Sequence, residues 1–255
     1  MKIKWNNSVL RMSVEGLASL DRPAEGLSEM GRRPEMPHPG GSCAGCGECA
    51  EACPSGAISA PPGSWELDLG RCIYCRRCVR ACPSGALSLV AAPEYAVRRG
   101  DLVFRRGEPT DRAPGAVDEA KRRAIGRSIH VRQVDTGSCN ACEVEIGSMS
   151  NQFYDAERFG IRIAASPRHA DALLVTGPLT ENMREAFDAV LGATPDPKIV
   201  VAMGACAISG GVFGRPGMSG TGAAAEVDVY IPGCPPPPGS LVRALLGALG
   251  ITGRR

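Results

Sequence analysis

Several features common in other protein classes are scarce or missing in this sequence. Aromatic residues make up only 4% of the 255 residues, and there are three histidines. No apolar run approaches the roughly 20 residues that a transmembrane helix needs. Residues 1–12 lack the apolar stretch of a secretory signal peptide and show no twin-arginine pattern, which indicates a cytoplasmic chain. A net charge of +2 does not favour nucleic acid as a partner.

The sequence also lacks the usual signatures of bond chemistry. The glycine-rich stretch 210–222 has no Gly-Lys-Ser/Thr of a phosphate-binding loop, and no Ser/His/Asp set or carboxylate pair is evident. We expect His169 to be a neutral histidine satisfied within the fold. We expect Glu145 to be an ordinary buried or interface carboxylate rather than a proton carrier. No catalytic residue is predicted in this chain.

Cysteine is plentiful, with twelve in the chain. In a cytoplasmic protein, reduced thiolates that bind metal are a better interpretation than disulfides. Eight of the twelve form two runs with the pattern C-x2-C-x2-C-x3-C-P, namely Cys43, Cys46, Cys49 and Cys53, then Cys72, Cys75, Cys78 and Cys82. Zinc sites use one or two C-x2-4-C pairs and do not need the third cysteine or the proline. The spacing therefore predicts two 4Fe–4S clusters.

In this pattern the fourth cysteine of each run reaches across to the other cluster. One predicted ligand set is Cys43, Cys46, Cys49 and Cys82, and the other is Cys72, Cys75, Cys78 and Cys53. Residues 41–92 resemble bacterial two-cluster 4Fe–4S ferredoxins, which implies an α+β domain with two similar halves. Short strands are expected at 57–58 and 86–90.

Charged residues differ between the two runs. Four arginines surround the second run, at positions 71, 76, 77 and 80, whereas the first run has Glu48 and Glu51. Positive charge stabilises the more negative, reduced form of a cluster, so the second cluster is predicted to be the easier to reduce. The alternative is that these arginines lie on a solvated face or contact another subunit.

The sequence divides into four parts. Residues 1–40 are predicted to be an N-terminal arm and linker, 41–92 the two-cluster domain, 93–127 a basic connector, and 128–255 an α/β domain. The connector is predicted to contain a strand at 102–104 and a helix at 118–124. Apolar runs at 162–164, 172–175, 199–202 and 227–231, with helices at 181–191 and 240–249, favour a parallel sheet covered on both faces.

The remaining four cysteines are positioned to meet in the α/β domain. Cys139 and Cys142 form a C-x2-C pair that opens a helix, whereas Cys206 and Cys234 each follow a predicted strand. Loops at the carboxyl ends of parallel strands converge on one crevice. Neighbouring glycines permit the tight turns that such a site needs. From the residues alone, zinc would suit this set nearly as well as an iron–sulfur cluster.

From about Ile129 onward, the sequence resembles the small electron-transfer subunit of membrane-bound energy-converting nickel–iron hydrogenases of the formate hydrogenlyase and Ech types. That family is related to the 20 kDa B subunit of respiratory complex I. The matching stretches are 135–145, 166–171, 174–178, 204–211 and 229–236. The resemblance implies a flavodoxin-like fold and a third 4Fe–4S cluster on Cys139, Cys142, Cys206 and Cys234, beside the metal centre of a large subunit.

The C-x2-C pair favours hydrogenase, because the 20 kDa subunits of complex I carry adjacent cysteines at this point. Two positions depart from the family pattern. Ala141 stands where the family usually has glycine, which would disfavour a left-handed backbone there, and Pro237 replaces a common arginine.

The implied partners are a nickel–iron large subunit, membrane subunits that hold the chain at the cytoplasmic face, and a soluble ferredoxin or dehydrogenase. The alternatives are the same subunit in a complex I-like quinone oxidoreductase, and a non-catalytic iron–sulfur sensor or scaffold.

Overall fold

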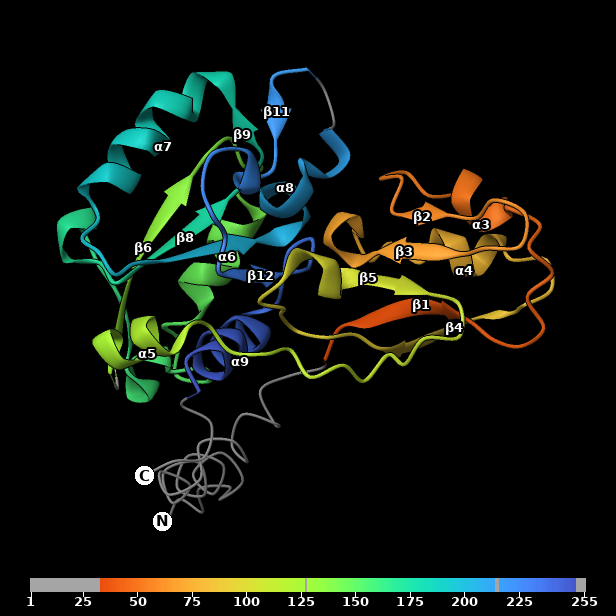
Figure 1. Cartoon of the computed structure of the whole chain (residues 1–255), viewed down its shortest axis with the longest axis horizontal. Helices are drawn as coiled ribbons and strands as arrows, with labels where there is room; N and C mark the ends of the chain where they lie inside the picture. Colours follow the sequence, from red (N-terminus) through yellow and green to blue (C-terminus); the bar gives the residue numbers. More distant parts are fainter. Residues whose placement is uncertain (1–32, 127, 214–215, 251–255) are drawn as a thin grey trace, which may run out of the picture.

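A five-stranded parallel sheet organises the larger part of the molecule, on the left of Figure 1. The computed structural model describes residues 33–126, 128–213 and 216–250. The strands are β6 (Ile129–Asp135), β7 (Ile161–Ile163), β8 (Ala172–Thr176), β10 (Ile199–Met203) and β12 (Val229–Ile231). Their order is β12-β10-β8-β6-β7. This is the flavodoxin-like order, with a topological switch point between β6 and β8.

Four of these strands were predicted within one or two residues of their observed bounds, but β6 was missed. Its sequence alternates apolar and polar residues, with Ile129 and Val131 buried and His130 and Arg132 partly exposed. A search for continuous apolar runs overlooks such a strand. β8 and β10, in contrast, are buried at every residue, because helices cover both faces of the sheet.

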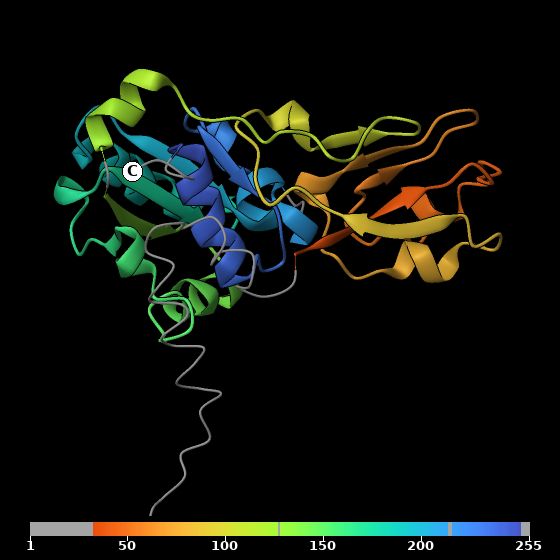
Figure 2. The same cartoon turned by 90° about the horizontal axis from the view of Figure 1, so that it is seen from below.

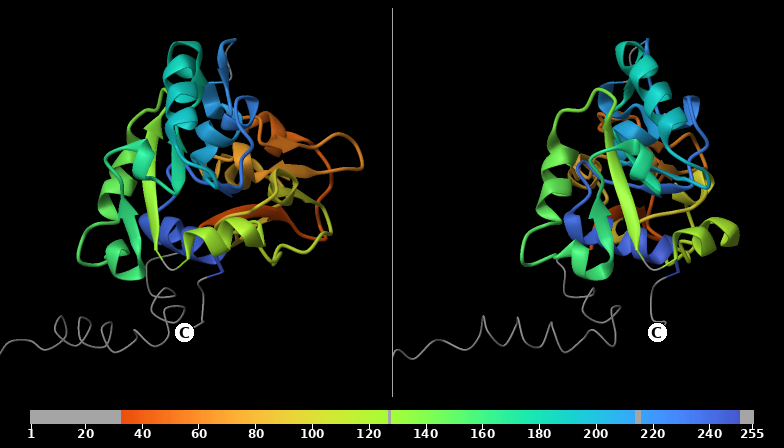
Figure 3. Two further views of the ribbon diagram at one scale, coloured as in Figure 1. Left: turned by 60° about the vertical axis from the view of Figure 1, so that its left-hand side comes forward. Right: turned by 90° about the vertical axis from the view of Figure 1, so that its left-hand side faces the viewer.

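Two layers of helices cover the sheet. Helices α6 (Ala141–Ser148) and α9 (Pro238–Ala248) share one core with Leu174, Val201 and Met203. On the other face, α7 (Glu181–Ala193) and α8 (Gly204–Ser209) share a second core with Leu173, Val175 and Val200. Neighbouring residues of one strand thus enter different cores, as the period of two requires. Figure 3 shows the sheet between these layers.

The smaller part of the molecule contains the two cysteine runs. Strand β1 (Glu35–Pro39) pairs antiparallel with β4 (Leu87–Ala91), and β2 (Ile58–Ser59), β3 (Glu66–Asp68) and β5 (Val103–Arg105) form a second sheet. Two short helices follow the cluster loops, α3 (Glu48–Glu51) and α4 (Arg77–Ala81).

Two strands of this part fall outside the predicted ferredoxin-like region. β1 lies in the segment predicted to be arm and linker, and β5 lies in the predicted connector. Residues 1–32 of the predicted arm lie outside the described residues. The linker prediction is therefore wrong for Glu35–Pro39, because pairing with β4 makes this segment part of the sheet.

The connector continues across the α/β part to α5 (Glu119–Ile125), as Figure 2 shows from below. Ala96 forms an isolated antiparallel bridge with Tyr230 of β12, and the Val117 amide donates to the Ala248 carbonyl at the end of α9. Helix α9 is buried nearly all round. The connector packs against it, since a Cβ at Gly247 would clash with the Tyr95 ring.

The two parts share one hydrophobic core. Leu67, Leu69, Leu102 and Phe104 belong to the same cluster as Ile208 of α8. The 3-10 turn η2 (Leu69–Arg71) meets α8 so closely that a Cβ at Gly70 would lie 2.7 Å from Ile208. The Ser209 hydroxyl donates to the Gly70 carbonyl at 3.1 Å. Gly70 precedes Arg71 and Cys72, and Ser209 is on the helix that contains Cys206. This hydrogen bond therefore joins the second cysteine run to that helix.

The remaining elements are short. Strands β9 (Leu179–Thr180) and β11 (Met218–Ser219) pair with each other, and the 3-10 turns are η3 (Arg99–Leu102), η4 (Ala156–Phe159), η5 (Pro167–His169), η6 (Gly211–Phe213) and η7 (Thr221–Ala223). None of the helices in the described part of the chain is long and apolar enough to span a membrane.

Candidate metal centres

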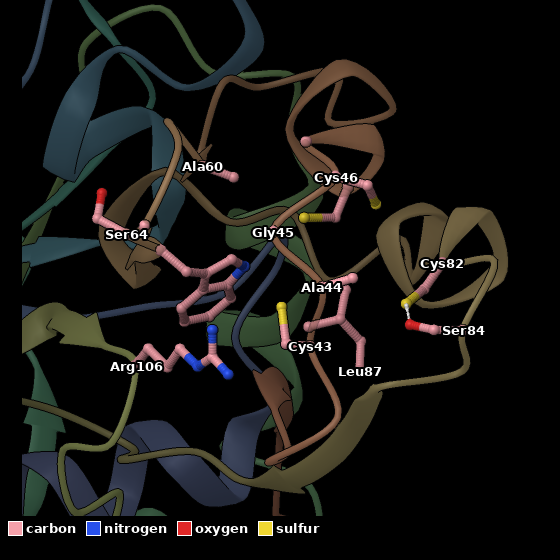
Figure 4. A pocket seen from close by; sticks show the side chains of 14 residues that line it. Cys43, Ala44, Gly45, Cys46, Ala60, Ser64, Cys82, Ser84, Leu87 and Arg106 are labelled. Atoms are coloured by element: carbon pink, nitrogen blue, oxygen red, sulfur yellow. Dashed lines mark hydrogen bonds between the residues drawn. The ribbon is translucent and has the colours of Figure 1, made fainter.

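Two pockets in the smaller part are each lined by four cysteines. The first pocket, drawn in Figure 4, is lined by Cys43, Cys46, Cys49 and Cys82. The second pocket is lined by Cys53, Cys72, Cys75 and Cys78. Each pocket thus takes three cysteines from one run and the fourth from the other run. Across residues 33–126, 128–213 and 216–250, no three His, Cys, Asp or Glu side chains are close enough to coordinate a single metal ion.

The two loops repeat the same backbone conformation. In the first run, Gly45 and Gly47 have positive φ, and in the second run Tyr74 and Arg76 have positive φ at the matching positions. Glycine tolerates this conformation, whereas tyrosine and arginine adopt it at a cost of about 1–2 kcal/mol per residue. The second loop therefore retains its shape through its surroundings rather than through glycine.

The fourth cysteines have matching contacts as well. The Cys53 sulfur lies 3.7 Å from the Ser55 hydroxyl, and the Cys82 sulfur lies 3.6 Å from the Ser84 hydroxyl, the contact drawn in Figure 4. Both serines belong to the C-P-S-G-A sequence that closes each run. These contacts favour the thiolate form of both sulfurs, since a hydroxyl can donate to it.

Burial and the proximity of other thiols raise the pKa of two cysteines in the second pocket. Burial raises the pKa of Cys72 to about 12, and the neighbouring Cys78, Cys53 and Cys75 add to the increase. Burial likewise raises the pKa of Cys78 to about 11. Several thiolates in one apolar pocket need a compensating positive charge. Bound metal ions provide that charge and release the protons.

A third set of cysteines lies at the carboxyl ends of β6, β10 and β12. The loop after β6 is held by Asp135, whose side chain accepts from the Gly137 and Ser138 amides at 2.8 and 2.7 Å. Asn140 then has a left-handed φ of 70°, and α6 begins at Ala141. The left-handed residue is therefore Asn140. The expected conflict at Ala141 does not arise, because Ala141 is already helical.

Two glycines keep this crevice open. A Cβ at Gly204, which begins α8 with a φ of 87°, would lie 2.9 Å from the Cys142 sulfur. A Cβ at Gly211 would lie 2.7 Å from the Cys206 sulfur. Cys234 follows Gly233 in the loop after β12, and the Ala205 amide donates to the Gly233 carbonyl at 2.8 Å. The predicted departure at Pro237 falls at the N-cap of α9.

The thiols of the third set lie close enough together to raise one another's pKa. Burial is the main cause that raises the pKa of Cys142 to about 12. Smaller increases come from the negative charges of Glu143, Cys206, Cys234 and Cys139. Burial also raises the pKa of Cys206 to about 11, again with contributions from Cys234 and Cys139. The structure thus brings together the four cysteines that the sequence analysis grouped.

Glu143 was not singled out from the sequence, although it is the carboxylate beside these thiols. Its Oε1 accepts from the Gln133 side chain at 3.4 Å, and its Oε2 is buried without a hydrogen-bond partner in the structure. Glu145, which we considered instead, is partly exposed on the same helix. His169 is exposed in η5, before β8 and so at the opposite end of the sheet from the thiols. The expectation of a histidine satisfied within the fold is wrong.

Comparisons with known proteins find two family models that match this chain. Residues 139–248 match the family model "NADH ubiquinone oxidoreductase, 20 Kd subunit", and residues 42–86 match the "4Fe-4S dicluster domain". The probable membrane-bound hydrogenase subunit mbhJ of Pyrococcus furiosus is 47% identical over 127 residues, which are 49% of this chain and 76% of that protein.

Two further relatives represent the two branches of the family. Formate hydrogenlyase subunit 7 of Escherichia coli is 47% identical over 129 residues, covering 50% of this chain and 51% of that protein. The B subunit of the NADH-quinone oxidoreductase of Citrifermentans bemidjiense is 46% identical over 106 residues, covering 41% of this chain and 62% of that protein.

A flavodoxin-like sheet with four thiols at its carboxyl end, joined to a 4Fe–4S dicluster domain, defines an iron–sulfur protein of the electron-transfer class. More particularly, the chain belongs to the NADH ubiquinone oxidoreductase 20 Kd subunit family, together with membrane-bound hydrogenase subunit mbhJ.

Proposed function

We propose that this chain is the electron-transfer subunit of a membrane-bound hydrogenase complex and carries three 4Fe–4S clusters. The observation that carries the proposal is the grouping of all twelve cysteines into three sets of four. The first pocket would use Cys43, Cys46, Cys49 and Cys82, the second Cys53, Cys72, Cys75 and Cys78, and the third site Cys139, Cys142, Cys206 and Cys234. When bound, such clusters supply one-electron couples at potentials set by their surroundings.

The arrangement of the loops supports a linear order of the three sites. Tyr74 and Arg76 line the second pocket, and they also line a pocket between the two parts of the molecule together with Gly233 and Pro235. The second site is therefore a neighbour of the Cys234 loop. The Gly70–Ser209 hydrogen bond links the same two regions on another side. We infer that the second site lies between the first and the third.

Exposed apolar side chains beside the third site favour a large protein partner there. Val144, two residues after Cys142, is 61% exposed, and Val212 and Phe213 directly follow Gly211 with 45% and 38% exposed. Cys139 and Cys234 are themselves exposed. A 4Fe–4S cluster held partly by exposed thiolates beside apolar side chains suits coverage by another subunit. The partner is inferred to be a nickel–iron large subunit, with membrane subunits that hold the complex at the cytoplasmic face.

The composition of the native complex tests this proposal. We expect anaerobic purification through a tag on this chain to recover a large subunit with two C-x2-C pairs and about one nickel per complex. A complex without nickel that reduces a quinone would establish the complex I-like alternative. Recovery of this chain alone, as a homo-oligomer without membrane subunits, would favour a sensor or scaffold and contradict the proposal.

A further inference from the structure

The first pocket contains a buried hydrogen-bond donor that has no acceptor in the protein. Trp65, which precedes β3, is 3% exposed and lines the pocket of Cys43, Cys46, Cys49 and Cys82. Its indole Nε1 is buried without a hydrogen-bond partner. An indole N–H can only donate, and leaving such a group unsatisfied costs about 1–3 kcal/mol. A buried donor at the wall of a ligand pocket is best explained by the ligand.

The backbone and the ring of Trp65 each have a contact with another strand. The Trp65 carbonyl accepts from the Arg106 amide at 3.1 Å, which ties the residue to the end of β5. The His38 ring of β1 meets the indole edge to face, with the ring centroids 5.9 Å apart at 71°. The indole is therefore packed within the protein at the wall of the pocket.

Of the four cysteines that line this pocket, Cys49 is the one that is buried, as Trp65 is. This cysteine is buried on α3 and lines the same pocket. The indole N–H of Trp65, which lines the pocket with Cys49, can donate to a thiolate or to a cluster sulfide there. Donors of this kind stabilise negative charge on sulfur, whether the sulfur belongs to cysteine or to the cluster.

We propose that the indole N–H of Trp65 donates a hydrogen bond to the Cys49 sulfur, or to a cluster sulfide beside it, and thereby raises the reduction potential of the cluster in the first pocket. The inference rests on the ligand set proposed above. Because the reduced cluster carries more negative charge than the oxidised one, the hydrogen bond stabilises the reduced form more strongly. Trp65 is thus a residue that sets the potential and does not ligate iron.

The variant Trp65→Phe keeps an aromatic ring and removes the donor. The full chain is loaded with iron under anaerobic conditions and titrated with a reductant while EPR is recorded. We expect the variant to have a lower reduction potential for the first cluster than the wild type. The expected change is about tenfold in the equilibrium constant, which is about 59 mV for a one-electron couple. Loss of the corresponding signal in Cys46→Ser identifies the first cluster, and the second cluster serves as an internal reference.

Two controls separate the hydrogen bond from changes in packing. A tryptophan analogue at position 65 with sulfur in place of the ring N–H preserves shape and should lower the potential as Phe does. Tyr74→Phe, in the second pocket, should leave the first cluster unchanged. Full iron content with an unaltered potential in Trp65→Phe would overturn the inference, as would a wild-type potential in the isosteric analogue. A wild-type chain without iron in this pocket would refute the ligand set itself, and the inference with it.

Discussion

Replacing Cys206 by serine is expected to remove about four of about twelve iron atoms per chain and to abolish electron delivery to the large subunit. Cys206 lies on α8. Its charge raises the pKa of Cys142, and the charges of Cys139 and Cys234 raise the pKa of both thiols. Serine retains the size of the side chain but replaces a soft thiolate with a hard hydroxyl, which binds iron–sulfur clusters poorly. The remaining three thiolates leave one iron of the cluster without a cysteine ligand.

Iron analysis and low-temperature EPR of the anaerobic protein measure this loss. The signals of the first two clusters should remain, because their ligands come from other loops. Val212→Ser offers a matched control, since it places the same residue at an exposed position near Cys206 and should keep all the iron. Unchanged iron content and electron delivery in Cys206→Ser would show that this thiol is not a ligand.

The second large effect concerns an ion pair that joins the two parts of the molecule. Arg243 of α9 donates to both carboxylate oxygens of Glu94 with its Nε, at 2.8 Å each, and the Ser240 hydroxyl donates to the same carboxylate at 3.0 Å. The side chains are only 9% and 12% exposed. Glu94 lies at the start of the connector, shortly after β4, so this contact fastens the chain that leaves the smaller part to the last helix of the α/β part.

Arg243→Ala is expected to lower the free energy of unfolding by about 3–5 kcal/mol, because it leaves a buried carboxylate without its partner. Urea denaturation measures the change. Arg184→Ala breaks the pair Arg184–Asp188 on α7, whose side chains are 48% and 51% exposed, and should cost less than about 1 kcal/mol. If the two variants lost similar stability, the pair would not fasten the two parts together.

The spacing of the cysteines predicted the organisation of the sites because it is a local property. Three thiols on one tight loop must face one pocket whatever surrounds the loop, and the repeated run predicted which cysteine crosses over. The grouping of Cys139 with Cys206 and Cys234 needed only the rule that parallel strands end at one edge. The shape of these loops was not predicted. Asp135 accepts two loop amides, and Gly204 and Gly211 leave space for the Cys142 and Cys206 sulfurs.

The missed features depend on contacts between distant segments. β1 is a short strand defined by pairing with β4, and Glu35–Pro39 contains two prolines, which are typical of a linker in the sequence. Trp65 stands among proline and glycine residues without any periodic pattern. Only the folded chain shows that its ring enters the first pocket.

The charges around the second site differ in the folded chain from what the sequence alone indicates. Arg76 forms an ion pair with Glu35 at 3.0 Å, and both residues line the second pocket. Arg106, from the connector, lines the first pocket instead (Figure 4). The prediction that the second cluster is the easier to reduce therefore rests on Arg71, Arg77 and Arg80, which are exposed to solvent and screened by it.

The most direct test of the account is the metal content of the anaerobically prepared full chain, with iron and zinc measured on the same sample. Three 4Fe–4S clusters predict about twelve iron atoms per chain and no stoichiometric zinc. A chain with about eight iron atoms and one zinc ion would confine iron–sulfur clusters to the ferredoxin-like part and contradict a relay that reaches Cys206.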